Sequence, residues 1–331
     1  MSLALSPRGR GLLVVTLVAA TLCVAAFLAW QAQGRQAPNV VRVVFRRNAN
    51  YLVYFVARDR GLFSKHGILI QESELESSNL MVQALASRQA DFIPSSSVPG
   101  LYSAEANSPG TFRFLYMMLM EKGQGNDAII VRRDAPYQSL GDLRGLRIGT
   151  QPGATSLILL RLIFESAGLQ LDSTVFAQEM EPRTLLQALE ARRIQAVFAI
   201  EPLITQGLEA GISRVLEAEP IENRIMNPIP IAGGVVTAEL AREHLSTVNR
   251  LSGAMNEAID YVRANPDDAR AIMAAAIGMP AGTAARLGIN SYWKLQEVQP
   301  QRVQELADLF VRYGALVRPI NTSLMLLRPT Q

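Results

Sequence analysis

Apolar and polar residues alternate along most of the chain in short blocks that predict strands and helices in turn. Four- to nine-residue apolar runs predict buried strands, and amphipathic stretches between them predict helices. The expected strands are 40–45, 68–73, 90–94, 112–119, 128–131, 146–150, 174–178 and 195–200. The expected helices between them are 52–60, 79–87, 153–167 and 182–191. This alternation predicts an α/β fold with largely parallel sheets, followed by a mostly helical segment from 245 to 317.

A repeat is visible within this pattern. Residues 82–91 (VQALASRQAD) align with residues 186–195 (LQALEARRIQ) at an offset of 104, and both segments precede an expected strand. The strands that open the two halves, near Val43 and Ile148, are 105 residues apart. A repeated order of helix, turn and strand predicts two lobes of the same topology.

The N-terminal segment differs from the rest of the chain. Residues 11–30 (GLLVVTLVAATLCVAAFLAW) carry no charge and follow Arg8 and Arg10. About twenty apolar residues match the thickness of a bilayer core, and the arginines favour a cytoplasmic N-terminus. We expect either an uncleaved anchor in the inner membrane or a signal peptide cut near residues 24–26. In both cases the rest of the chain would be extracytoplasmic, in the periplasm or tethered to the membrane facing it.

Composition narrows the function. The 331 residues are 49% hydrophobic with a formal net charge of +3, and no run of Lys or Arg indicates a nucleic-acid partner. The one cysteine, Cys23, and two histidines, His66 and His244, cannot form a disulfide or a histidine-rich metal site. The sequence contains no nucleophile elbow, P-loop, dinucleotide fingerprint or HExxH motif. We therefore expect no metal or cofactor, and a protein that is not an enzyme.

Several segments together resemble a known family. They are 54–68 (YFVARDRGLFSKHGI), 83–92, 140–149 (LGDLRGLRIG) with 152–156 (PGATS), 196–203 (AVFAIEPL) and 254–268. In this order and spacing they resemble the solute-binding proteins of ABC importers for nitrate, sulfonates, taurine and thiamine-precursor pyrimidines. The resemblance covers residues 41 to 318, nearly the whole chain beyond the apolar segment.

This resemblance implies a two-lobed type II periplasmic-binding fold with a ligand cleft between the lobes. Lobe I would comprise residues 39–131 and 237–331, lobe II residues 132–236, and residues 1–38 the apolar helix and linker. The two crossover strands of the hinge would lie near 128–131 and 232–236. The partners implied are a small-molecule solute and the permease and ATPase subunits of an ABC transporter.

The sequence also departs from the family in ways that bear on its ligand. The loop 46–51 lacks the aromatic Trp that family members often carry there, Arg88 and Arg192 stand where Gly is usual, and Gln195 replaces a usual Asp. A membrane-tethered ligand sensor or accessory protein with the same lobes is the alternative function. A thiamine-pyrimidine enzyme is disfavoured, because the only cysteine lies in the apolar segment.

Ligands of open α/β sheets bind beyond the carboxyl ends of the strands, which selects the loops 46–51, 95–98 and 151–156. The last two adjoin expected helix N-termini, which favour a small anionic or polar solute. Alternatively, the hydroxyl groups of residues 95–97 and 155–156 cap these helices and do not bind a ligand. Arg46 and Arg47 alternate, so at most one should face the cleft. The candidate ligand-binding residues are Asn48, Asn50, Tyr51, Ser95, Ser96, Ser97, Asn126, Thr150, Ala154, Thr155, Ser156 and Glu201.

Overall fold

The computed structural model describes residues 40–327, apart from the side chain of Ala154. The chain divides into two units, Met1–Asn39 and Val40–Gln331, and only the second is described below. The expected membrane segment at 11–30 lies outside the described residues. Within residues 40–327, none of the helices combines the length and apolar character that crossing a membrane requires.

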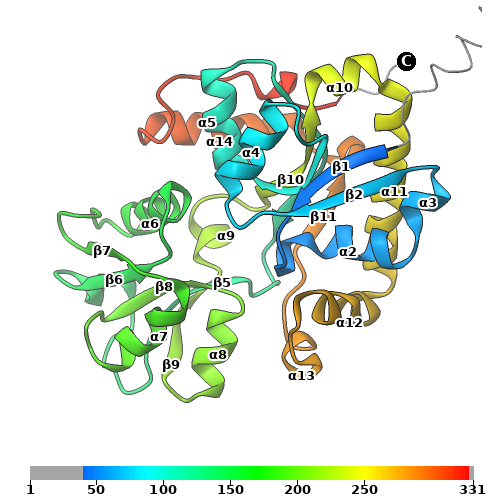
Figure 1. Cartoon of the computed structure of the whole chain (residues 1–331). Helices are drawn as coiled ribbons and strands as arrows, with labels where there is room; N and C mark the ends of the chain where they lie inside the picture. Colours follow the sequence, from blue (N-terminus) through cyan, green and yellow to red (C-terminus); the bar gives the residue numbers. More distant parts are fainter. Residues whose placement is uncertain (1–39, 328–331) are drawn as a thin grey trace, which may run out of the picture. The chain divides into compact units, whose positions relative to one another are not determined.

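The strands form two separate sheets (Figure 1). The six-stranded sheet has the order β11-β4-β10-β3-β1-β2, and the five-stranded sheet has the order β7-β6-β8-β5-β9. The strands of the first are β1 (Val40–Phe45), β2 (Leu69–Glu74), β3 (Phe92–Ser97), β4 (Phe112–Met120), β10 (Ile229–Thr237) and β11 (Ser291–Lys294). Those of the second are β5 (Asp127–Arg132), β6 (Arg147–Thr150), β7 (Phe176–Glu179), β8 (Ala196–Ile200) and β9 (Ser213–Ala218). The expected mixed α/β fold is confirmed.

Three details of the expected sheets were wrong. The sheets are not largely parallel, because β10 pairs antiparallel with β3 and β4, β11 with β4, and β5 with β8 and β9. Strands β9 and β11 were not expected, and β11 interrupts the segment expected to be helical. The strands β5 and β10, near the expected crossovers, each belong wholly to one sheet. The chain passes between the sheets in the segments before them, 121–126 and 219–228, which we call the junction.

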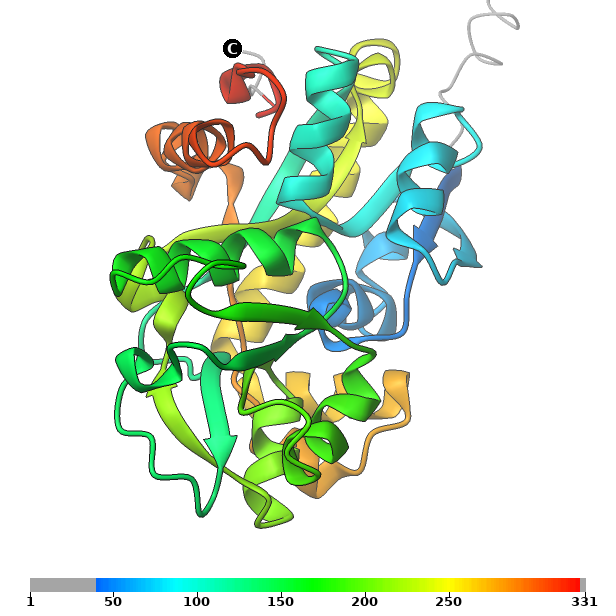
Figure 2. The ribbon, with the colours of Figure 1, turned by 90° about the vertical axis from the view of Figure 1, so that its left-hand side faces the viewer.

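Helices cover both faces of each sheet (Figures 1 and 2). The α-helices are α2 (Leu52–Asp59), α3 (Leu62–Lys65), α4 (Ser78–Ala86), α5 (Val98–Asn107), α6 (Ala154–Ser166), α7 (Pro182–Glu190), α8 (Leu203–Glu209), α9 (Pro220–Arg224), α10 (Ala238–Glu243), α11 (Leu245–Ala264), α12 (Pro266–Ile277), α13 (Ala281–Ala284) and α14 (Pro300–Arg312). The 3₁₀ turns are η1 (Ala49–Tyr51), η2 (Leu140–Leu143), η3 (Leu295–Glu297) and η4 (Thr322–Leu324). Pro266 begins a new helix, α12, and Asn265 alone separates it from the end of α11.

The two-residue period of the strands explains how each sheet is buried on both sides. In β5, Ala128 and Ile130 pack with α7 and α8, whereas Ile129 and Val131 belong to the core that includes α6. The six-stranded sheet likewise packs α2, α11 and α12 on one face and α4, α5 and α14 on the other. The core on the α6 and α14 side contains residues of both sheets, so the sheets are joined by shared packing as well as by the chain.

The repeat found in the sequence is a repeat in the structure. Arg88 and Arg192, 104 residues apart, both adopt left-handed backbone conformations, with φ of 63° and 60°. Each donates its N–H to the carbonyl three residues earlier over the same distance, 3.1 Å. Glycine adopts a left-handed conformation most easily, which accounts for the glycine that is usual at these two positions of the turn. In this chain arginine adopts the same conformation at both positions.

Asp91 and Gln195, which follow the two repeated turns at equivalent positions, make equivalent hydrogen bonds. Asp91 accepts the N–H of Arg42 at 2.8 Å, and Gln195 accepts the N–H of Arg147 at 3.1 Å. Asp91 adds an ion pair with the Arg42 guanidinium that Gln195 cannot make. The substitution of Gln for Asp therefore preserves the backbone contact and removes only the charge.

Candidate functional site

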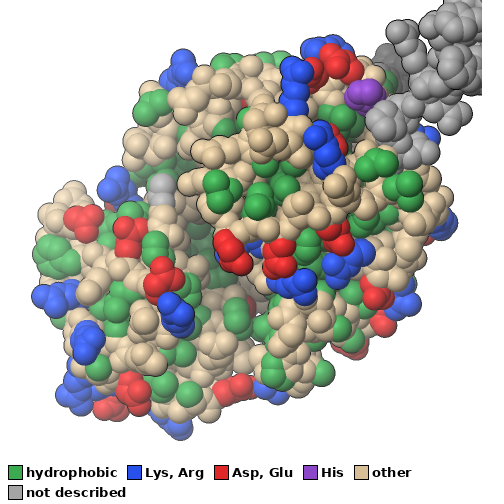
Figure 3. Space-filling view, in the orientation of Figure 1, with side chains coloured by type: hydrophobic (Ala, Val, Ile, Leu, Met, Phe, Trp, Pro, Cys, Tyr) green, Lys and Arg blue, Asp and Glu red, His purple; other side chains and the backbone are tan. Residues whose placement is uncertain are grey.

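A cavity of about 230 Å³ lies between the two sheets, and its walls come from both. In the space-filling view the surface between the two parts is recessed (Figure 3). We call this cavity the cleft. It is lined by Arg46, Asn48, Ala49, Asn50, Tyr51, Ser78, Ser95, Ser97, Met118, Met120, Asn126, Thr155, Leu159, Ile200, Glu201, Pro202, Ile221, Ile231, Ala232, Leu287, Gly288 and Asn290.

The loop after β1 supplies three of the expected residues. Asn48, Asn50 and Tyr51 all line the cleft, and the Asn48 side chain accepts the Asn50 N–H at 3.0 Å to start η1. Tyr51 is buried, and its hydroxyl donates to the carbonyl of Ser95 at 2.8 Å. Burial raises the pKa of Tyr51 well above its ordinary value, an effect that the nearby positive charge of Arg46 opposes. Tyr51 therefore enters the cleft as a neutral phenol that fixes the loop to β3.

The serines after the expected third strand are themselves strand residues. Ser95 and Ser97 line the cleft, but Ser96 between them is buried and is not part of the lining. Because side chains alternate along a strand, Ser96 faces away from its two neighbours and lies outside the lining of this cavity. Ser97 precedes α5 but makes no side-chain cap, so the expected capping alternative is not seen at this helix.

The five-stranded sheet contributes Thr155 from α6 and Glu201 from the end of β8. Thr150 and Ser156 do not line the cleft: Thr150 is completely buried, and Ser156 follows Thr155 around the helix. Ala154 begins α6, and its side chain lies outside the described part of the chain. Glu201 accepts hydrogen bonds from the N–H and hydroxyl of Thr205, at 3.1 and 2.8 Å, and thereby also stabilises the first turn of α8.

The first turn of α6 was expected to offer free N–H groups to an anion. The N–H of Gly153 is instead bonded to the carboxylate of Glu179 at 2.6 Å. Thr155, in this first turn, lines the cleft, and no intramolecular hydrogen bond of its hydroxyl is found within residues 40–327.

Arg46 and Arg47 separate as alternation predicts. Arg47 is exposed and pairs with Glu74 at 2.8 Å. Arg46 is half-buried and lines the cleft, and its guanidinium has no hydrogen-bond or ion-pair partner among the described residues. Arg46 is the cation of the cleft lining, and without a partner among the described residues its guanidinium is available to an anion.

Much of the cleft wall is apolar, and the sequence did not predict it. Met118 and Met120 come from the end of β4, Ile231 from β10, and Ile221 from α9. The rule on carboxyl ends of strands could have selected the methionines. Leu287, Gly288 and Asn290 belong to the segment 285–290 between α13 and β11, which we call the strap, and no motif in the sequence marks it.

The strap separates the cleft from a second cavity of about 590 Å³, and Gly288 and Asn290 line both. Asn290 accepts a hydrogen bond from the cleft residue Asn126 at 2.8 Å. A Cβ on Gly288 would lie 2.3 Å from the Gln124 carbonyl oxygen, so only glycine allows this close approach to the junction. The orange chain in Figures 1 and 2 shows the strap continuing into β11 at the edge of the six-stranded sheet.

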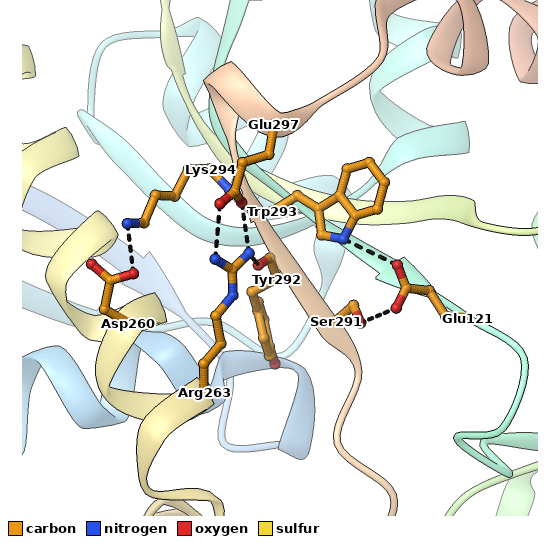
Figure 4. Close-up of polar contacts among 8 residues, drawn as sticks. All are labelled: Glu121, Asp260, Arg263, Ser291, Tyr292, Trp293, Lys294 and Glu297. Carbon is orange, nitrogen blue, oxygen red and sulfur yellow. Dashed lines mark hydrogen bonds and ion pairs between the residues drawn. The ribbon is translucent and has the colours of Figure 1, made fainter.

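The charged groups of the second cavity are paired (Figure 4). Arg263 donates to both oxygens of Glu297, at 2.9 and 2.6 Å. Glu121 accepts from the Ser291 hydroxyl at 2.6 Å and from the Trp293 indole at 3.1 Å. Arg270 donates to the Leu287 carbonyl and to Asp267. These contacts hold the strap and β11 in place and leave no charged group of this lining without a partner in the described residues.

Metal chemistry finds no support in the residues that the structure describes. No group of three or more His, Cys, Asp or Glu side chains between residues 40 and 327 could hold a metal ion. The cleft lining contains neither His nor Cys. The arrangement is therefore suited to binding a small molecule through one cation, several hydroxyl and amide groups and an apolar wall.

Known proteins share sequence features and the fold with this chain. Residues 34–278 match the model of the NMT1-like family. A Brucella abortus protein named as a putative binding protein is 25% identical over 276 residues, covering 80% of this chain and 83% of the relative.

Solved structures share the fold. The periplasmic aliphatic sulphonate binding protein SsuA from Escherichia coli superposes with a TM-score of 0.73 at 19% identity, covering 89% of this chain and 94% of that one. The alkanesulfonate-binding protein SsuA from Xanthomonas axonopodis pv. citri, bound to MOPS, gives 0.68 at 17% identity, covering 88% and 99%. A mutant of DszB in complex with biphenyl-2-sulfinic acid gives 0.64 at 15% identity, covering 87% and 96%. At these identities the likeness shows a periplasmic-binding-protein fold.

Proposed function

The chain belongs to the NMT1-like family, and from this premise we propose that it is a solute-binding protein that captures a small anionic solute in the cleft. The observation that carries the proposal is Arg46, a half-buried residue of the cleft lining whose guanidinium has no hydrogen-bond or ion-pair partner in residues 40–327. Hydrogen bonds that involve a charged group contribute about 1.5–3 kcal/mol, so an anion at this position would gain substantially.

The other polar groups around Arg46 suit the same ligand. Ser95 and Ser97 line the cleft from β3 of the six-stranded sheet, and Thr155 lines it from α6, which packs on the five-stranded sheet. A solute that accepts hydrogen bonds from both walls would draw the sheets together by a hinge motion at the junction. We therefore keep two lobes as part of the proposal. Because β5 belongs to the five-stranded sheet and β10 to the six-stranded sheet, the boundaries of the lobes lie at the junction, 121–126 and 219–228, and not at the expected residues 131 and 236.

Delivery to a transporter and location outside the cytoplasm complete the proposal. Solved structures with this fold include a periplasmic aliphatic sulphonate binding protein, and we infer that this chain likewise serves the permease and ATPase of an ABC importer. Residues 11–30 would direct the chain across the inner membrane and, if uncleaved, tether it there. Fractionation of cells that express the full chain, with a form beginning at Asn39 as control, tests this: only the full chain should reach the periplasmic side.

Sulfonates are the first solutes to test. The apolar wall formed by Met118, Met120 and Ile231 suits a solute with a short hydrocarbon part beside its anionic group. The experiment is a thermal-shift screen of the purified full-length chain against alkanesulfonates, taurine, nitrate, small carboxylates and pyrimidines. A solute at about 100 times its Kd should stabilise the protein by about 2.7 kcal/mol. If anions bind no better than uncharged compounds, or if Arg46→Met binds them as well as the native chain, the proposal fails.

A further inference from the structure

Two acidic side chains are buried against each other at the junction. Asp127 begins β5 directly after the first passage between the sheets, and Glu222 lies in α9 within the second. Asp127 is 1% exposed and Glu222 is 7% exposed. Asp127 accepts the N–H of Ile221, the residue before Glu222, and one oxygen of each carboxyl group is buried without a donor among the described residues. The two carboxyl groups can satisfy each other only if one of them carries a proton as donor.

The residues around Asp127 and Glu222 do not supply enough hydrogen-bond donors or positive charge to stabilise two ionised carboxylates. One oxygen of Asp127 accepts the Ile221 N–H at 3.1 Å, while its Oδ1 and the Oε2 of Glu222 are buried without any other donor in the described chain. Glu105 shows how this fold holds a single buried carboxylate: it accepts the backbone N–H groups of Gly110, Thr111 and Phe112. Two adjacent carboxylates without such donors or a cation cannot both be ionised at modest cost.

The other charged groups near the pair do not replace the proton. Glu219 adds further negative charge, and its carboxylate is itself occupied by the N–H groups of Gly123 and Gly125, both at 2.7 Å. Arg224, further along α9, is bonded through two nitrogens to Glu217 of β9. From α6, which packs against α9, the charged side chains are Arg161, which donates to the Tyr313 carbonyl, and Glu165.

We propose that Asp127 and Glu222 share one proton at neutral pH, and that this proton joins the two passages between the sheets. The inference goes beyond solute capture, because it assigns a proton-binding site that makes the junction sensitive to alkaline pH. Loss of the proton would place two repelling charges between the passages. The neighbours of the pair in sequence, Asn126 and Ile221, are cleft residues, so the loss would also disturb the cleft.

The direction of the pH dependence follows from the pKa. Burial, and next the hydrogen bond and charge of Glu222, raise the pKa of Asp127 to about 9 in the folded chain. The unfolded value is about 3.9. Between these values the folded chain keeps a proton that the unfolded chain has released, so stability falls as pH rises towards about 9.

The test compares the native full-length chain with Asp127→Asn and Glu222→Gln. Each variant keeps a hydrogen bond, since its amide can donate to the remaining carboxylate, but neither needs the proton. Between about pH 6 and about pH 9 the melting temperature of the native chain should fall by several degrees more than that of either variant. Glu165→Gln, which removes a carboxylate from α6 outside the pair, should follow the native pH profile.

Infrared spectroscopy gives a second measurement that does not depend on stability. The native chain at neutral pH should show a protonated-carboxyl band that both amide variants lack. Parallel melting profiles with no such band would overturn the proposal. Stabilisation of the native chain by added Ca²⁺ at neutral pH, absent in both variants, would also overturn it, because a metal ion would then occupy the place of the proton.

Affinity measurements separate this proposal from the proposed function. If ethanesulfonate binds, its affinity for the native chain should fall several-fold from about pH 6 to about pH 9, and that for Asp127→Asn should change less. Failure of ethanesulfonate and the other anions to bind would contradict the proposed function, whereas the melting and infrared results would still decide the shared proton.

Discussion

The two cavities on either side of the strap share Gly288 and Asn290 but differ in how their charges are satisfied. The larger one, about 590 Å³, is lined by charged groups that already have partners, such as Arg263 with Glu297. The smaller cleft, about 230 Å³, holds Arg46 without a partner in residues 40–327. The difference that matters is whether the charged side chains of a cavity already have partners, and not the size of the cavity. Charged groups with partners stabilise the fold, whereas one without a partner is available to a ligand.

The same contrast assigns roles to similar residue types. Arg263 and Arg270 use their guanidinium groups to hold the carbonyls of Tyr292 and Leu287, and so fix the strap from outside. Arg46 makes no such contact within the described chain. We therefore expect substitutions around the larger cavity to change stability, and those in the cleft to change affinity.

Arg46→Met should have the largest effect on binding. Removing a charge-assisted contact of about 1.5–3 kcal/mol should weaken binding of an anionic solute by roughly 10- to 100-fold. Melting temperature should hardly change, because among residues 40–327 no side-chain hydrogen bond or ion pair of Arg46 is lost. Calorimetric titration measures the change, with Arg47→Met as control: Arg47 pairs with Glu74 at the surface, so its loss should leave affinity unchanged. Equal losses in both variants would contradict a specific role of Arg46.

Gly288→Ala should damage the wall that the two cavities share. The added Cβ would meet the Gln124 carbonyl and the Asn126 side chain, at 2.3 and 2.5 Å, so the strap or the junction must shift. We expect a loss of about 1–3 kcal/mol in the free energy of unfolding, together with weaker solute binding. Gly282→Ala is the matched control, because a Cβ there meets nothing within 4 Å. Denaturant titration of both variants measures the difference, and a fully stable Gly288→Ala chain would show that the strap is not constrained.

Thr155→Ala should weaken solute binding by roughly fivefold, the effect of one hydrogen bond of about 1 kcal/mol. The adjacent Ser156→Ala should have no effect, since Ser156 does not line the cleft. Calorimetry on the two variants tests the placement of α6. A larger effect at Ser156 than at Thr155 would mean that the helix presents a different face to the solute.

Arg263→Met should have the smallest effect. Its ion pair with Glu297 is partly exposed, with side-chain exposures of 41% and 37%, so the stability lost should be at most about 1 kcal/mol. Solute affinity should stay at the native value. A clear loss of affinity without a loss of stability would move the binding site from the cleft to the larger cavity.

The sequence predicted the parts of the fold that depend on local patterning. The strands at 40–45 and 146–150 and the repeat at 88 and 192 could be located because burial sets the period and the turn recurs at a fixed offset. Strand β11 and the strap could not be found, since four residues of strand at a sheet edge carry little periodic signal. The antiparallel pairing of β5 with β8 and β9, and of β10 with β3 and β4, depends on contacts between residues distant in sequence.

The cleft was predicted in outline for a similar reason. The rule on strand ends selected the loops that hold Asn48, Tyr51 and Thr155. It did not decide which residues within a loop face inward, and so Ser96 and Thr150 were included although both are buried elsewhere. The apolar wall and Asn290 come from segments brought together only by tertiary packing.

The most direct test of the central claim is a crystal structure of the chain with an anionic solute that stabilises it in the thermal-shift screen. The account predicts the solute in the cleft, with its anionic group within hydrogen-bond distance of the Arg46 guanidinium and with the paired groups of the larger cavity unchanged. A solute bound in the larger cavity, between Arg263 and Trp293, with the cleft empty, would contradict it.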